Sequence, residues 1–114
     1  LDSIHAFKNV LFKFDTFELL AVAKSELDEI EAYLSVNKRL KIQISGHTDA
    51  MGSASYNQEL SKNRAKAVAS YLMEKGIDSS RIEYQGLGST QPVTDNKTSV
   101  GRQRNRRVEF RITL

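Results

Sequence analysis

The sequence predicts an α+β fold, a β-α-β-α-β-β sandwich in which two helices pack on one face of a four-stranded mixed sheet. Four segments alternate apolar and polar residues with the period of a half-buried strand, and two longer segments repeat apolar residues every three or four positions. Each helical segment lies between two strand segments, which favours one sheet with both helices on the same face. The 114 residues fit a single domain, residues 1–114.

The first half of the chain contains two strand segments around one helix. Residues 9–15 (NVLFKFD) alternate large apolar side chains and predict the first strand. Residues 18–35 predict a helix, and residues 40–45 (LKIQIS) predict the second strand. The apolar stripe of the helix consists of Leu20, Ala23, Leu27, Ile30 and Leu34.

A second helix follows a glycine-containing loop. Ser53 or Ser55 can cap the start of this helix. The helix is predicted to run to about Lys75, and Gly76 supplies the stop signal. Residues 81–86 (RIEYQG) then predict the third strand.

The last part of the chain is predicted as a loop and a strand. Residues 87–101 hold the only proline among several turn-forming residues, which predicts a long surface loop. Residues 106–114 predict the fourth strand, with Val108, Phe110, Ile112 and Leu114 pointing inward. We expect Arg107 and Arg111 on the solvated face of this strand, at an edge of the sheet.

Composition excludes several classes of protein. No apolar run approaches the roughly 20 residues that cross a bilayer, and the absence of cysteine excludes disulfides and thiolate metal sites. The net charge of the chain is +3, and the positive charge is concentrated in residues 101–114, which contain five arginines and one glutamate. Aromatic residues are not interleaved with these arginines, so we expect no nucleic-acid partner. The chain opens without a signal segment, and we expect it to be a domain of a longer, membrane-anchored protein.

The loop at residues 45–53 (SGHTDAMGS) concentrates the polar chemistry of the chain. His47 and Asp49 are too few for a metal site, which usually has three or four protein ligands, and no spacing links them to His5. Ser45, His47 and Asp49 follow one strand and cannot surround a scissile carbonyl, and the glycines match no phosphate-binding fingerprint. We therefore expect no metal, no cofactor and no catalytic activity.

Arg64 is the second informative residue. It lies four residues from both Leu60 and Val68, in line with the inward stripe of the second helix, where an unpaired guanidinium would be costly to desolvate. Because the 46–53 loop leads directly into this helix, Asp49 can lie near Arg64. Two interpretations remain open: a structural salt bridge in a protein-interaction module, or a pair of opposite charges that grips a zwitterion.

The sequence also contains four motifs: GHTD, YNxxLSxxRAxxV, GxGxxxP and GRxxNRRV. Together they resemble the OmpA-like C-terminal domain, a family that includes outer membrane protein A, the peptidoglycan-associated lipoprotein and MotB. The resemblance covers nearly the whole chain, from VLFKFD to the last strand.

The resemblance implies a non-catalytic domain that binds peptidoglycan through the diaminopimelate of the stem peptide. It implies a periplasmic location, with attachment to the outer membrane through segments outside this chain. In the family, the aspartate of GHTD and the arginine of LSxxRA hold the ligand, and these fall on Asp49 and Arg64. The positions that map around the pocket are Asp15, Thr16, Thr48, Asn57, Leu60, Asn105 and Arg106. Residues 15–18 (DTFE) depart from the family pattern, so Phe17 is expected to reshape one wall of the site.

Overall fold

The computed structural model describes residues 3–7, 19 and 21–114. In chain order the elements are β1 (Ser3–Phe7), α1 (Ala21–Val36), β2 (Lys41–His47), α2 (Ala54–Glu74), the short 3-10 helix η2 (Ser79–Arg81), β3 (Ile82–Gly86), α3 (Ser99–Asn105) and β4 (Arg107–Thr113). The α+β class and the predicted strands at 40–45, 81–86 and 106–114 are confirmed. The strand predicted at 9–15 lies outside the described residues.

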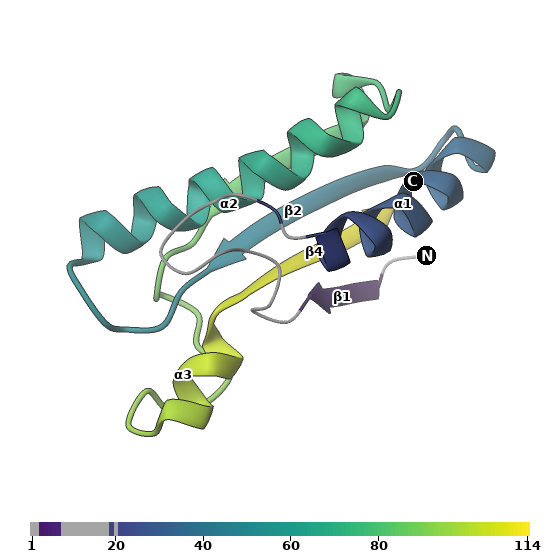
Figure 1. The fold of residues 1–114 in the computed structure, drawn as a ribbon. Helices are drawn as coiled ribbons and strands as arrows, with labels where there is room; N and C mark the ends of the chain where they lie inside the picture. Colours follow the sequence, from purple (N-terminus) through teal and green to yellow (C-terminus); the bar gives the residue numbers. More distant parts are fainter. Residues whose placement is uncertain (1–2, 8–18, 20) are drawn as a thin grey trace.

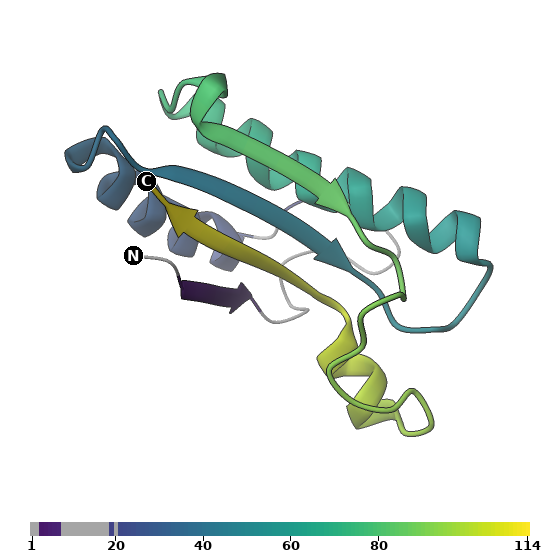
Figure 2. The same ribbon diagram turned by 180° about the vertical axis from the view of Figure 1, so that it is seen from behind.

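The described strands form one mixed sheet in the order β1-β4-β2-β3 (Figures 1 and 2). β4 pairs antiparallel with both β1 and β2, and β2 pairs parallel with β3. Parallel neighbours need a crossover connection, and α2 provides it between β2 and β3. β4 therefore lies inside the sheet, which corrects the prediction that it is an edge strand.

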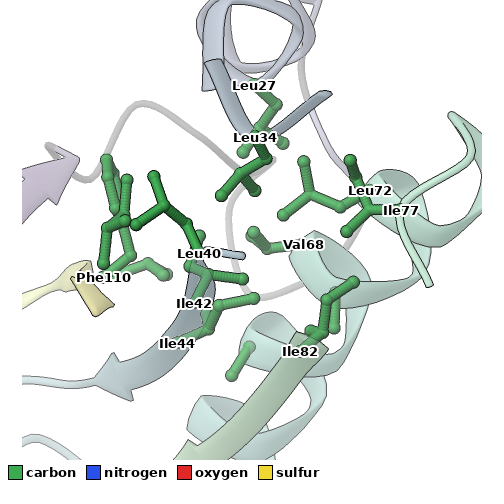
Figure 3. Packing of buried hydrophobic residues seen from close by; sticks show 14 of the residues in the cluster. Leu27, Leu34, Leu40, Ile42, Ile44, Val68, Leu72, Ile77, Ile82 and Phe110 are labelled. Carbon is green, nitrogen blue, oxygen red and sulfur yellow. The ribbon is translucent and has the colours of Figure 1, made fainter. Parts of the chain in front are cut away.

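Both long helices cover the same face of the sheet, as the two opposite views show. Their inward stripes meet the alternating apolar residues of the strands in one core (Figure 3). The core draws on α1, β2, α2 and β4 through residues such as Leu27, Leu34, Ile42, Ile44, Val68, Leu72 and Phe110. Among the described helices, none has the length and apolar character needed to cross a membrane.

The start and end of α2 follow local chemistry. Ser53 is the N-cap, and its hydroxyl oxygen accepts a hydrogen bond from the backbone N–H of Tyr56 at 3.1 Å. After the helix, Gly76 adopts φ 107°, a backbone conformation that favours glycine. The structure thus selects Ser53 over Ser55 as the cap and confirms Gly76 as the stop.

A pair of glycines lets α2 lie directly on the sheet. Gly46 of β2 and Gly86 of β3 are register partners. A Cβ atom on Gly46 would lie 2.1 Å from the carbonyl oxygen of Ser61, and one on Gly86 would lie 2.4 Å from the backbone nitrogen of Lys62. Backbone therefore meets backbone here, and this contact fixes the first half of α2 beside the end of β2.

Three local predictions are wrong. α3 begins within the segment that was predicted to be a loop, and its buried residues are Gly101 and Asn105, so no apolar period marks it. Leu114 is 71% exposed rather than inward. Arg107 is buried rather than solvated, because its guanidinium donates hydrogen bonds to Glu109, to the Asn105 carbonyl and to the Gln91 carbonyl.

Candidate functional site

Asp49 lies in the loop between β2 and α2, and it is 7% exposed. One of its carboxylate oxygens, Oδ1, accepts a hydrogen bond from the backbone N–H of Met51 at 2.9 Å. The side chains of Thr48 and Asn57 hold the backbone around it: the Thr48 hydroxyl and the Asn57 amide both donate to the Asp49 carbonyl, at 2.8 and 3.3 Å. The Asn57 amide also donates to the Met51 carbonyl at 2.9 Å. The carboxylate is therefore held in a defined position.

Arg106 forms an ion pair with this carboxylate. Its Nη1 atom lies 2.5 Å from Asp49 Oδ2, with the Arg106 side chain 36% exposed. Arg106 is the residue between α3 and β4, so the pair joins the end of α3 to the loop that follows β2. The sequence placed Arg106 only at the border of the site, whereas the structure makes it a direct partner of Asp49.

Arg64 and Leu60 lie on α2, and both are half-buried. Arg64 is engaged in an interaction within the chain. It follows Asn57 by two helical turns, roughly 10 Å along the axis, on the face that also buries Ser61 and Ala65. Arg64 therefore lies on the same side of α2 as these buried residues, as the inward stripe predicts.

Asn105 is fully buried and its amide is saturated. Its Oδ1 accepts hydrogen bonds from the backbone N–H groups of Val93 and Thr94, and its Nδ2 donates to the Thr94 carbonyl and to Asn96 Oδ1. An amide has two donor and two acceptor positions, so all four are used within the chain. The Asn105 amide thus holds the 93–96 loop, and its contact with a ligand stays a prediction.

Asn96 belongs to this network, although sequence reasoning did not assign it to the site. Its side-chain oxygen accepts a hydrogen bond from the Ala50 backbone N–H at 3.2 Å, beside Asp49. In the sequence, Asn96-Lys97-Thr98 matches a glycosylation pattern, and Asn96 also ends the segment GLGSTQPVTDN that resembles the family. Neither pattern indicates that Asn96 approaches the GHTD loop. The remaining predicted residues, Asp15 and Thr16, lie outside the described residues, as does Phe17.

His47 precedes the site and is buried at 2% exposure. Its Nε2 lies 3.5 Å from Glu109 Oε1, and neither ring nitrogen has a hydrogen-bond partner among the described residues. Burial lowers the pKa of His47 below its ordinary value of 6.5, and the nearby Arg107 charge lowers it further, while Glu109 opposes both effects. Among the described residues, no three histidine, aspartate or glutamate side chains are grouped to hold a metal ion.

A separate polar hollow lies on the face of the sheet opposite the helices. Its volume is about 360 Å³, and its walls come from β2, β3, β4 and the loop after β3. Of the GHTD residues only His47 lines it. The Asp49–Arg106 pair is therefore distinct from this hollow.

Comparisons with known proteins agree with the fold and the motifs. A model of the OmpA family matches residues 11–106. Outer membrane protein A of Bordetella avium is 39% identical over 104 residues, covering 91% of this chain and 54% of that protein. This chain spans about half the length, or less, of curated relatives that it matches.

Two solved structures show the same arrangement. The peptidoglycan-associated lipoprotein from Burkholderia pseudomallei has a TM-score of 0.85 at 29% identity, covering 91% of this chain and 88% of that one. The periplasmic domain of Helicobacter pylori MotB has a TM-score of 0.86 at 25% identity, covering 98% and 76%. The similarity extends over nearly all of the present chain in both cases.

Proposed function

Since the chain belongs to the OmpA family, we propose that it is a non-catalytic module that binds peptidoglycan through the diaminopimelate of the stem peptide. In this role it anchors an outer-membrane or envelope protein to the cell wall from the periplasm. The names of the relatives support the proposal, since they include an outer membrane protein, a peptidoglycan-associated lipoprotein and a periplasmic domain.

The observation that carries the proposal is the buried carboxylate of Asp49, which is paired with the partly exposed guanidinium of Arg106. A carboxylate offers about four acceptor positions, and the hydrogen bonds described above use one on each oxygen. Asp49 therefore retains capacity to accept hydrogen bonds from an ammonium group. The same ammonium would share the carboxylate with Arg106, the more exposed member of the pair.

The ligand's carboxylate is assigned to Arg64. A guanidinium can bind a carboxylate through two parallel hydrogen bonds, and α2 presents Arg64 and Leu60 on the side of the helix that also carries Asn57. Leu60 supplies apolar contact for the methylene groups of diaminopimelate. Thr48, Asn57 and Asn105 act by holding the two loops, because their described hydrogen bonds end on loop backbone and on Asn96. Asp15 and Thr16 complete the proposed site by family resemblance.

The affinity for one stem peptide is expected to be modest, because the recognised head group is small and polar. The wall offers many such groups, so several anchored copies together retain the parent protein.

Sedimentation with purified sacculi tests the proposal. Asp49→Ala and Arg64→Ala, each shown to be folded by cooperative urea unfolding, are expected to stay in the supernatant while the parent pellets. Glu59→Ala on α2 and Arg104→Ala on α3 are the matched controls, because they remove the same charges from exposed positions. Both controls should pellet like the parent.

A titration resolves the chemistry of recognition. The diaminopimelate peptide should bind at least about tenfold more tightly than the same peptide with lysine, which lacks the second carboxylate; that factor corresponds to about 1.4 kcal/mol. Equal affinities would remove the role given to Arg64. If both site variants pellet like the parent, the domain is instead a protein-interaction module of the envelope in which these charges are structural.

A further inference from the structure

We infer that Asn96 is a positioning residue for Asp49, coupling α3 to the backbone of the loop that carries the carboxylate. The inference rests on the proposed function, because the positioned carboxylate is the one assigned to the ligand's ammonium group. Asn96 lies between the motifs GxGxxxP and GRxxNRRV. The inference rests on its contacts with the loop after β2 and with α3.

Asn96 is a junction between these segments. Its Oδ1 accepts hydrogen bonds from the Ala50 backbone N–H at 3.2 Å and from Asn105 Nδ2 at 2.9 Å. Its backbone carbonyl accepts a third hydrogen bond from Arg102 Nη1 at 3.0 Å. One half-buried asparagine thus joins the loop after β2 to two side chains of α3.

Two sets of contacts connect the end of α3 to the loop that carries Asp49. Arg106, at the end of α3, binds the carboxylate directly. Asn105, its neighbour in the chain, reaches the same loop through Asn96 and Ala50. Because both routes start from adjacent residues, the position of Arg106 and the position of Asp49 are set together. A shift of the Asn96 segment would therefore change the geometry of the charged pair.

The segment that carries Asn96 is itself fixed. Gly101 lies so close to it that an added Cβ would be 2.2 Å from the Asp95 carbonyl oxygen. On the other side, the Asp95 carboxylate accepts a hydrogen bond from the Lys97 backbone N–H at 2.9 Å. The backbone on both sides of Asn96 is therefore restrained.

Binding measurements on two substitutions at this position test the inference. The acceptor function needs only a side-chain oxygen, so Asn96→Asp keeps it and Asn96→Ala removes it. We expect Asn96→Ala to weaken binding of the diaminopimelate peptide by about tenfold, the scale of effect of losing a hydrogen bond. Asn96→Asp should stay within about threefold of the parent, and the exposed neighbour variant Lys97→Ala should bind like the parent.

The outcomes separate this inference from the proposed function. Parental affinity in Asn96→Ala, or an Asn96→Asp affinity as weak as that of Asn96→Ala, would overturn the positioning role. If the parent does not bind the peptide, the proposed function is wrong, and amide hydrogen exchange then decides on Asn96. Exchange at Ala50 should accelerate in Asn96→Ala relative to Asn96→Asp, and equal rates in the two variants would overturn the inference.

Discussion

His47 and Asp49 are two residues apart, yet their surroundings give them different roles. His47 is enclosed beside Glu109 and Arg107, and both of its ring nitrogens are buried without a hydrogen-bond partner in the part of the chain that the structure describes. Asp49 has hydrogen bonds on both carboxylate oxygens and a cationic partner that reaches solvent. We therefore assign the histidine to the scaffold.

The stability of the protein should depend on the protonation of His47. Its pKa in the folded state lies below the value of the unfolded chain, so protons bind more readily to the unfolded state. The free energy of unfolding should thus fall as the pH is lowered through about 6.5, by at most about 1.4 kcal/mol per pH unit for one proton, and level off below the folded-state pKa. Urea unfolding between pH 7.5 and 5.5 measures this slope.

The two histidines of the chain provide the comparison. His47→Gln should have a smaller slope than the parent over that interval, while His5→Gln reports what the other histidine contributes. A His47→Gln protein with the parental slope would contradict the assignment.

At the residue scale, the helical period alone indicates that Arg64 and Asn57 share one face of α2, two turns apart. Arg106 was harder to assign, because its partner Asp49 is 57 residues away and is reached only after the sheet has formed. No pattern in the sequence indicates that Asn96 contacts Ala50, since this hydrogen bond depends on how two loops meet.

Among the elements, α2 is positioned by the paired glycines Gly46 and Gly86. Alanine at Gly46 would place a methyl group on the backbone of Ser61, and alanine at Gly86 would do the same at Lys62. Each substitution should lower the free energy of unfolding by about 1–3 kcal/mol, the usual cost of overpacking. Urea unfolding of the single variants measures it.

The double variant makes this prediction more specific. Ser61 and Lys62 are adjacent in α2, so one outward movement of the helix relieves both clashes. The Gly46→Ala/Gly86→Ala protein should therefore lose less stability than the two single losses added together. Lys41→Ala, an exposed position of β2, should change stability by no more than about 0.5 kcal/mol. Strict additivity would mean that α2 does not move as a unit.

Element prediction from sequence followed the strength of the apolar pattern. β2, β3, β4 and both long helices have clear periods and were predicted within a few residues. α3 was missed because it has only seven residues and buries a glycine and an asparagine. β1 was missed because the five residues Ser3–Phe7 carry only a weak alternation. β4 lies inside the sheet because it pairs with both β1 and β2. The apolar pattern of one strand does not indicate which strands pair with it.

For the molecule as a whole, binding and stability should be linked. A ligand that binds only the folded state stabilises it, by about 2.7 kcal/mol at a concentration 100 times Kd. The diaminopimelate peptide should therefore raise the urea midpoint of the parent, with the increase growing with peptide concentration. Asp49→Ala should show no increase at the same concentrations. A parent protein that binds in a titration without being stabilised would show that the peptide also binds unfolded chains.

The pairing of Asp49 with Arg106 also bears on the time at which the candidate site is complete. The loop with Asp49 is translated well before Arg106, and the two meet only when β4 has docked between β1 and β2. Contacts between distant parts of a chain are slow to form compared with local helices. A polypeptide that is still folding thus lacks a complete candidate site, and we expect the proposed binding to the wall to begin only once the last strand is in place.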